Sequence, residues 1–286
     1  MLFVEKFDLK GRIAAITGGG GALCGAMASA LGAMDVKIAI IDKEDENARK
    51  RETSIREDGG TARAWVCDVL DPNELTDCYE DICSLWGEPD YLINGAGGNH
   101  PKGTTELEFL ESTPVSPLSS DKDQQGFFEL DPAAFRSVFD LNFMGTFLTT
   151  QVFSRGMVAK KHGAILNISS MSAIVPLTKV GAYSAAKAAV SNFTRWLAVH
   201  FAHTGVRVNA LAPGFIMTEQ LRFLHLDPKT DEPLPRAKKV IAHTPMGRYG
   251  EPEDLIGAVI WLLSDTAAFV TGVVIPIDGG FSAYAI

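Results

Sequence analysis

Two residues that lie four positions apart, Tyr183 and Lys187, indicate a definite chemistry. Positions i and i+4 share one face of a helix, so the two side chains are expected to be neighbours. A tyrosine with its ordinary pKa of about 10 is a poor catalyst at neutral pH, and a nearby ammonium group lowers that pKa. The pair is therefore a candidate for general acid–base catalysis. Alone it is weak evidence, because solvated helix faces often carry such pairs.

A serine pair, Ser169 and Ser170, adds weight to this interpretation. It follows a predicted buried strand over Ala164 to Ile168, and the predicted helix with Tyr183 extends from Ala182 to His203. A hydroxyl group at the end of that strand can hydrogen-bond the reacting oxygen of a substrate. A serine pair after a strand is also typical of an ordinary turn.

A glycine-rich turn near the start of the chain predicts a nucleotide-binding site. It reads Thr17-Gly18-Gly19-Gly20-Gly21-Ala22-Leu23-Cys24-Gly25 and lies between a predicted strand and a predicted helix. Glycine lets the backbone approach a pyrophosphate, and the helix N-terminus offers free N–H groups with a positive dipole end. A purely structural turn is the alternative. The expected cofactor contacts in this turn are Gly18, Gly20, Gly21 and Leu23.

Acidic residues end the next two predicted strands. Asp42 can accept hydrogen bonds from adenosine ribose hydroxyls and would repel a 2′-phosphate, which favours NAD over NADP; the adjacent Lys43 weakens that preference. Asp68 and Val69 are placed to border the adenine ring, although Asp68 equally fits the start of a helix. Asn94-Gly95-Ala96-Gly97 ends a fourth strand at the same crevice, so Asn94, Ala96 and Gly97 are expected cofactor contacts. Asn94 is equally consistent with a structural link between strands.

The elements around these residues predict an α/β fold. Apolar strands over 12–17, 36–41, 62–67, 91–93, 164–168, 207–211 and 273–277 alternate with helices over 22–32, 46–58, 72–86, 132–159, 182–203 and 252–263. This alternation is typical of a doubly wound parallel sheet, of about seven strands here, with helices on both faces, as in Rossmann-like folds. Two irregular excursions, over about 98–131 and 215–249, follow strand ends, where such sheets bind ligands. No repeat or linker is apparent, so a single domain over 1–286 is expected.

Bulk composition narrows the class of protein. Apolar residues make up 46% of the chain, which supports a sizeable core, and the net charge of −9 argues against a nucleic-acid or anionic-membrane partner. The four cysteines have neither zinc-site nor CxxC spacing, so reduced thiols are expected. The N-terminus lacks the layout of a signal peptide and no apolar run reaches membrane-spanning length. A soluble cytoplasmic protein follows, and no metal site is expected, because His100 completes no ligand set.

Taken together, these residues resemble the short-chain dehydrogenase/reductase family over essentially the whole sequence. The matching residues are Thr17-Gly18 with the glycine turn, Asn94-Gly95-Ala96-Gly97, Asn142 in Leu141-Asn142-Phe143, Ser170, Tyr183 with Lys187, and Pro213-Gly214. The spacing to Tyr183 resembles the family's and selects Ser170 over Ser169. One departure concerns the turn, which in the family usually reads TGxxxGxG; Ala22 and Cys24 replace its last two glycines. Cys24 in particular is expected to alter helix–strand packing or pyrophosphate approach.

The resemblance implies a set of roles. Tyr183 would exchange a proton with the substrate oxygen, Lys187 would lower the Tyr183 pKa and bind the nicotinamide ribose, and Ser170 would orient the carbonyl. Asn142 would support a water that links Lys187 to solvent. The residues implied along the nicotinamide and its phosphates are Pro213, Gly214, Ile216 and Thr218. The cofactor itself would carry the hydride.

Within the family, several stretches resemble the bacterial D-mannonate oxidoreductases of the short-chain type, also called fructuronate reductases. The more particular ones are Gly97-Gly98-Asn99-His100-Pro101 and Ala242-His243-Thr244-Pro245. A sugar acid needs a cation for its carboxylate and hydrogen-bonding groups for its hydroxyls. Candidates are Asn99, His100 and Lys102 in the first excursion, and Arg222, His225, Arg236 and His243 in the second. Each is equally consistent with a solvated loop residue.

Other functions stay open at this point. A gluconate 5-dehydrogenase or a 3-oxoacyl thioester reductase would use the same machinery, and a non-catalytic nucleotide-sensing protein can share the fold. The acidic composition does not favour docking of an acyl carrier. The family usually forms tetramers, so a homotetramer is expected, with the helix from Ala182 and the run around Phe281 and Tyr284 as candidate interfaces.

Overall fold

A seven-stranded parallel sheet forms the centre of the computed structural model, which describes residues 3–110, 125–218, 221–222, 225–227 and 230–285. The strand order is β3-β2-β1-β4-β5-β6-β7. The strands are β1 (Ile13–Thr17), β2 (Lys37–Asp42), β3 (Thr61–Val66), β4 (Tyr91–Asn94), β5 (Gly163–Ile168), β6 (Val206–Pro213) and β7 (Val274–Ile277). The predicted doubly wound sheet is confirmed.

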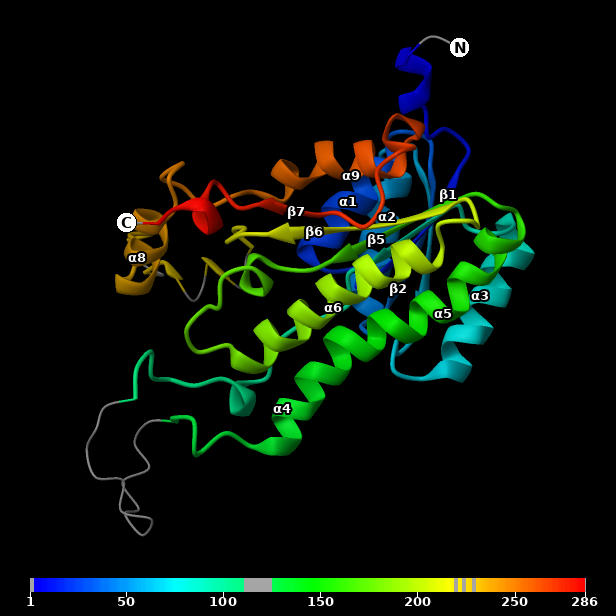
Figure 1. The fold of residues 1–286 in the computed structure, drawn as a ribbon. Coiled ribbons are helices and arrows are strands. Elements are labelled where there is room, and N and C mark those ends of the chain that lie inside the picture. Colours follow the sequence, from blue (N-terminus) through cyan, green and yellow to red (C-terminus); the bar gives the residue numbers. More distant parts are fainter. Residues whose placement is uncertain (1–2, 111–124, 219–220, 223–224, 228–229, 286) are drawn as a thin grey trace.

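Helices cover both faces of the sheet (Figure 1). They are α1 (Ala22–Gly32), α2 (Asp45–Glu57), α3 (Pro72–Trp86), α4 (Pro132–Phe139), α5 (Gly145–Ala159), α6 (Gly181–His200), α8 (Pro235–His243) and α9 (Ile256–Leu263). Side chains of α1, α2 and α9 pack with one core cluster, and those of α3, α5 and α6 pack with the other. Successive residues of β1 alternate between the two clusters, because side chains of a strand point to opposite faces. The central strands are therefore predominantly apolar on both faces.

Most predicted elements are confirmed to within two or three residues at their ends. The predicted helix over 132–159 is interrupted by a π-helical turn, Asp140–Met144, between α4 and α5. The predicted helix over 252–263 begins as a 3-10 helix, Pro252–Leu255, before α9. Helix α8 was not predicted, since its region contains several prolines. Residues 111–124 of the first excursion, and 219–220, 223–224 and 228–229 of the second, lie outside the described residues.

The strand order reverses beside β1, and this reversal positions the site. The chain leaves β1 toward β2 on one side, whereas β4 pairs with β1 on the other. Connections that start at the ends of β1 and β4 therefore diverge, and open α/β sheets bind ligands at such a point. Helix α8 and the C-terminal segment lie beyond the carboxyl ends of β6 and β7, on the same side of the sheet (Figure 1).

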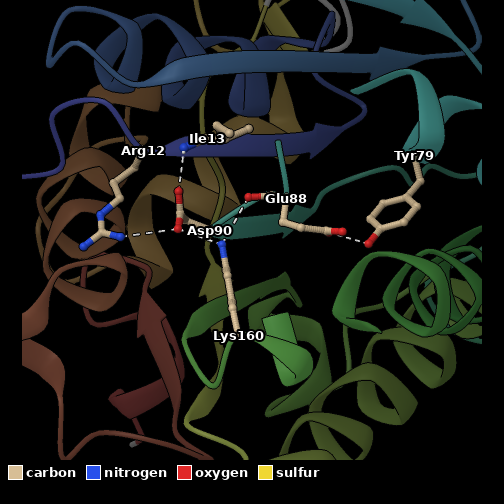
Figure 2. Close-up of polar contacts among 6 residues, drawn as sticks. All are labelled: Arg12, Ile13, Tyr79, Glu88, Asp90 and Lys160. Atoms are coloured by element: carbon tan, nitrogen blue, oxygen red, sulfur yellow. Dashed lines mark hydrogen bonds and ion pairs between the residues drawn. The ribbon is translucent and has the colours of Figure 1, made fainter. Parts of the chain in front are cut away.

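At the amino ends of the strands, away from the crevice, Asp90 links several elements. It immediately precedes β4 and is 8% exposed. Its carboxylate accepts a hydrogen bond from Ile13 N over 3.0 Å and forms ion pairs with Lys160 Nζ over 2.8 Å and Arg12 Nη1 over 3.4 Å (Figure 2). Lys160 Nζ also donates to the backbone oxygen of Glu88, whose carboxylate accepts a hydrogen bond from the Tyr79 hydroxyl. These contacts join β1, β4 and the end of α5 at the amino ends of the strands, opposite the crevice.

No helix among the described residues combines the length and the apolar character that a bilayer crossing requires.

Candidate active site

A cleft of about 1490 Å³ opens along the carboxyl ends of β2, β1, β4 and β5. Its walls include the glycine turn, Asp42, Asp68 and Val69, the segment Gly95–Gly98, and the side chains of Tyr183 and Lys187. The sequence prediction that these distant segments share one crevice is thus correct. A dinucleotide is long enough to require such an extended groove, and the volume exceeds that of the usual pocket for a single small ligand.

The glycine turn lies close to its neighbours, so side chains are poorly tolerated there. Gly18 has φ of +65°, and a Cβ on it would lie 3.0 Å from the backbone of Ala96. A Cβ on Gly20 would lie 2.8 Å from Ala48 N at the start of α2. Gly21 caps α1 with no side-chain hydrogen bond, so the first N–H groups of α1 are available to an anion. The turn therefore fits the pyrophosphate of a dinucleotide.

Cys24, where the turn departs from the family's usual glycine, packs directly against Gly95. A Cβ on Gly95 would lie 2.0 Å from Cys24 Sγ, so the thiol occupies the space that any side chain at position 95 would need. Close packing of α1 against the segment after β4 is possible because position 95 carries no side chain. Cys24 is 4% exposed, and burial raises the pKa of its thiol to about 12, which leaves it unreactive.

Asp42 ends β2 and contacts the glycine turn directly. Its carboxylate accepts hydrogen bonds from Gly20 N over 3.0 Å and Glu44 N over 3.1 Å. Lys43 Nζ is held by Asp68 Oδ2 over 2.7 Å, and this ion pair lowers the pKa of the Asp68 carboxyl. Asp68 Oδ1 also accepts from Leu70 N, so Asp68 shapes a turn as well as a cleft wall.

Lys187 is buried beneath the cleft floor, at 3% exposure, on α6. Its Nζ donates to Ile168 O at the end of β5 over 2.7 Å, which leaves two N–H groups for other partners. Burial lowers the pKa of Lys187 from 10.5 to about 8, because the charged form loses hydration. The helix is held to β5 by Ser169, whose Oγ donates to Lys187 O over 3.1 Å. Ser169 therefore points into the packing between α6 and β5.

Tyr183 lies on the same face of α6 and is half-buried; Lys187 Nζ lies 5.6 Å from its ring centroid. Burial raises the pKa of Tyr183, and a hydrogen bond with Ser170 acts in the opposite direction. The sequence prediction gave the lowering role to Lys187; in the structure the group that lowers this pKa is Ser170. The three side chains are nevertheless neighbours, as predicted.

Asn142 occupies the π-helical turn between α4 and α5 and is fully buried. Its Nδ2 donates to Gly98 O over 2.7 Å and to Val138 O over 2.8 Å. A Cβ on Gly97 would lie 2.5 Å from Asn142 Oδ1 and 3.3 Å from Lys187 Nζ, so both groups surround the same glycine. Single π turns inside helices often occur at functional sites.

Asn94 fits the structural alternative that the sequence left open. It is 2% exposed, and its Nδ2 donates to Thr150 Oγ1 and Asn167 Oδ1, each over 2.8 Å. Its side chain therefore links β4 to α5 and β5 and does not line the cleft, whereas the neighbouring Ala96 and Gly97 do.

The segment after β6 contributes less to the cleft than predicted. Thr218 lines it, but Pro213, Gly214 and Ile216 do not. Pro213 pairs with Ile277 of β7, and Ile216 is buried. Gly214 packs tightly against Asp278, since a Cβ at position 214 would lie 2.6 Å from the Asp278 backbone. Sequence reasoning missed other wall residues, among them Leu141, Met217, Pro252 and Ile256. Tertiary packing alone brings these to the cleft, and no local motif marks them.

The predicted substrate residues fall into two groups. Asn99, His100 and Lys102 are exposed and follow the cleft residues Gly97 and Gly98; His100 Nδ1 accepts a hydrogen bond from Lys102 N. His243, at the end of α8, packs in an aromatic cluster against Phe281 and Tyr284, with ring centroids 4.5 and 5.4 Å away.

Three other candidate side chains already have partners. Arg222 pairs with Asp231, and Arg236 pairs with Glu108 over 3.4 Å. His225 is buried, with its Nδ1 2.6 Å from the hydroxyl oxygen of Tyr249. Glu108 also accepts from Lys239 Nζ over 2.9 Å, so the first excursion is joined to α8.

Comparison with known proteins agrees with this geometry. The family model described as short chain dehydrogenase matches residues 12–228. A protein of Bacillus subtilis (strain 168) named "Uncharacterized oxidoreductase UxuB" is 47% identical over 97% of each sequence. A Haemophilus influenzae protein named "Uncharacterized oxidoreductase" is 44% identical over 100% of this chain and 98% of its own. A crystal structure of a provisionally named D-mannonate oxidoreductase from Haemophilus influenzae, with bound NAD, superimposes with a TM-score of 0.91 at 44% identity, over 97% of both proteins.

Proposed function

Because the chain belongs to the short-chain dehydrogenase family, we propose that it is an NAD(H)-dependent oxidoreductase that interconverts D-mannonate and D-fructuronate. The observation that carries the proposal is the cleft that extends from Asp42 at one end to Tyr183 and Lys187 at the other. This arrangement can bind a dinucleotide and exchange a proton with a substrate oxygen at one end of it. The provisional name of the solved relative favours a sugar acid as the substrate.

Charge at the adenosine end favours NAD over NADP. The Asp42 carboxylate retains lone pairs for ribose hydroxyls beyond its two backbone contacts, and it would repel a 2′-phosphate. Lys43, the adjacent cation that could offset this repulsion, is bound to Asp68. NAD in the solved relative supports the same choice.

The mechanism follows from the groups around Tyr183. A bound nicotinamide would supply or accept the hydride at the substrate carbon. During reduction, the O–H bond of Tyr183 breaks and its proton forms a new O–H bond on the former carbonyl oxygen. Ser170, which acts to lower the pKa of Tyr183, would stabilise the phenolate that remains. Lys187, with its pKa lowered to about 8, holds a proton that can be lost near neutral pH, and Asn142 lies beside it near Gly97.

We assign the substrate carboxylate to Lys102. Among the candidate cations in the described residues, Arg222 and Arg236 are already neutralised by carboxylates, whereas Lys102 is exposed and has no described ion-pair partner. It also follows directly on the cleft residues Gly97 and Gly98. Asn99 and His100 beside it are suited to the hydroxyl groups of a sugar acid.

The test is NADH oxidation by the purified protein with D-fructuronate, other keto sugar acids and neutral ketohexoses. We expect fructuronate to be the preferred substrate and NADH to outperform NADPH. Lys102→Met should raise KM for fructuronate more than tenfold, in line with loss of a charge-assisted contact, and leave KM for NADH unchanged. Lys6→Ala, a change of another exposed lysine near the distant N-terminus, is the matched control. Turnover of a different sugar acid with none of fructuronate would contradict the substrate assignment.

We further propose a homotetramer that uses the exposed aromatic face of α6. Trp196 is 55% exposed and stacks between Phe193 and His200, and Val199 is 78% exposed. Apolar patches of this kind mark association surfaces. Sedimentation of the protein at micromolar concentration should give the mass of a tetramer, and Trp196→Glu should reduce it.

A further inference from the structure

Ser172 lies two residues after Ser170, in the short 3-10 helix Met171–Ala173, and it has no role in the function proposed above. Its backbone N–H donates to Ser170 Oγ over 3.1 Å, and its Oγ donates to the same oxygen over 3.0 Å. The residue is 4% exposed, so bulk water has little access to its hydroxyl group. Ser172 thus directs two donors at a single atom of Ser170.

The hydrogen-bonding capacity of Ser170 is limited by these two contacts. A serine hydroxyl has one proton to donate and two lone pairs with which to accept. Ser172 fills both lone pairs, so the capacity that remains to Ser170 is its own proton. Ser170 then cannot accept the phenolic proton of Tyr183, so a hydrogen bond between these two hydroxyl groups has to run from Ser170 to the tyrosine oxygen.

We propose that Ser172 is a positioning residue that fixes Ser170 as a permanent hydrogen-bond donor toward the reacting oxygens. This inference rests on the proposed function, because a donor of fixed direction is useful where a carbonyl oxygen gains negative charge and Tyr183 gives up its proton. If Ser170 accepted the Tyr183 proton instead, that proton would be directed away from the substrate. Ser172 therefore keeps the phenolic proton available for transfer.

The electrostatics of Tyr183 agree with this direction. Ser170 lowers the pKa of Tyr183, although burial has the larger effect and raises it, and a hydroxyl group that donates to the phenolate has this effect. The other titratable groups described near this end of the cleft are Lys187 on α6, 5.6 Å from the Tyr183 ring, and the Cys24 thiol of α1, which interacts with Lys187. Neither contacts Ser172.

The experiment measures the titration of Tyr183 without turnover. The protein is labelled with 3-fluorotyrosine, and the resonance of Tyr183 among the five tyrosines is identified by its loss in Tyr183→Phe. Fluorine lowers the pKa of the phenol, which keeps the titration within a range where the fold is stable. We expect Ser172→Ala to raise the Tyr183 pKa by up to about one unit, less than Ser170→Ala, because one lone pair of Ser170 becomes free to accept. Ser172→Thr, which keeps the hydroxyl, should retain the wild-type value.

Ser191→Ala is the matched control. It removes a buried serine hydroxyl that contacts Ser169 Oγ at 2.6 Å and does not contact Ser170. An unchanged Tyr183 pKa in Ser172→Ala, or an equal shift in Ser191→Ala, would overturn the proposal. With an active substrate, Ser172→Ala should lower kcat about threefold to tenfold with little change in KM. Since the fluorine titration needs no substrate, failure of the proposed function and failure of this inference are distinguishable.

Discussion

Replacement of Lys187 by methionine should stabilise the cofactor-free protein, and the gain in unfolding free energy should be larger at pH 7 than at alkaline pH. Methionine has a similar length and no charge to bury. In the wild type, burial lowers the pKa of Lys187 from 10.5 to about 8, which means that the folded state disfavours the ammonium form. One pKa unit corresponds to about 1.4 kcal/mol, so this penalty amounts to about 3 kcal/mol of unfolding free energy.

The sign of the pH dependence follows from where the proton is held. Below pH 8 both the folded and the unfolded protein keep the Lys187 proton, and the wild type carries the full penalty. Between about pH 8 and pH 10.5 the folded lysine has lost its proton while the unfolded one retains it, so wild-type stability rises with pH. Above pH 10.5 both forms are neutral and the penalty is gone.

The measurement is urea unfolding of both proteins at equal concentration, at half-unit intervals from pH 7 to pH 10.5. Other groups titrate in this range, but they are common to both proteins and cancel in the difference. From pH 7 to pH 10.5, we expect the unfolding free energy of the wild type to rise by about 3 kcal/mol relative to that of Lys187→Met. Parallel curves for the two proteins would refute the argument that Lys187 is buried as an ammonium group.

Three further predictions concern other parts of the molecule. Asp42→Ala should weaken NADH binding about tenfold to a hundredfold, through lost charge-assisted hydrogen bonds, and should reduce the difference in affinity between NADH and NADPH. Titration by cofactor fluorescence measures both affinities, and an unchanged preference for NADH would contradict the prediction. Gly95→Ala should destabilise the fold by about 2 kcal/mol through its clash with Cys24 Sγ. Cys24→Ala in the same protein should recover only part of that loss, because the new Cβ would still lie 2.9 Å from Thr17 O. Additive losses in thermal unfolding would count against this coupling between positions 24 and 95. Asp90→Asn should cost about 2 kcal/mol of stability and leave KM for NADH unchanged, because its contacts lie at the amino ends of the strands, opposite the cleft. A raised KM in steady-state assays would show that the two ends of the sheet are coupled.

Local patterns in the sequence predicted the elements well wherever the signal itself is local. Apolar runs define the strands, and Ala22–Gly32 and Pro72–Trp86 were predicted with the bounds that the structure has. The π turn at Asp140–Met144 escaped prediction because it changes the backbone by one residue without changing the apolar pattern. Helix α8 escaped because its amphipathic face covers only a small cluster around Ala237 and Val240.

The site was predictable in its residue types and less so in its contacts. Tyr183, Lys187 and Asp42 lie where strand ends and a helical spacing put them. The packing of Cys24 against Gly95 and the link from Lys43 to Asp68 depend on segments that meet only in the folded protein. For the same reason the direction of the pKa change at Tyr183 was misjudged, since burial is not visible in a helical spacing.

The most direct test of the proposed function is turnover of D-fructuronate with NADH that carries deuterium at the transferred position of the nicotinamide. We predict that the product is D-mannonate, with deuterium on the carbon that bears the new hydroxyl group, and that Tyr183→Phe binds NADH yet forms no such product. Product without deuterium, or equal deuterium transfer by Tyr183→Phe, would contradict hydride transfer with Tyr183 as the proton donor.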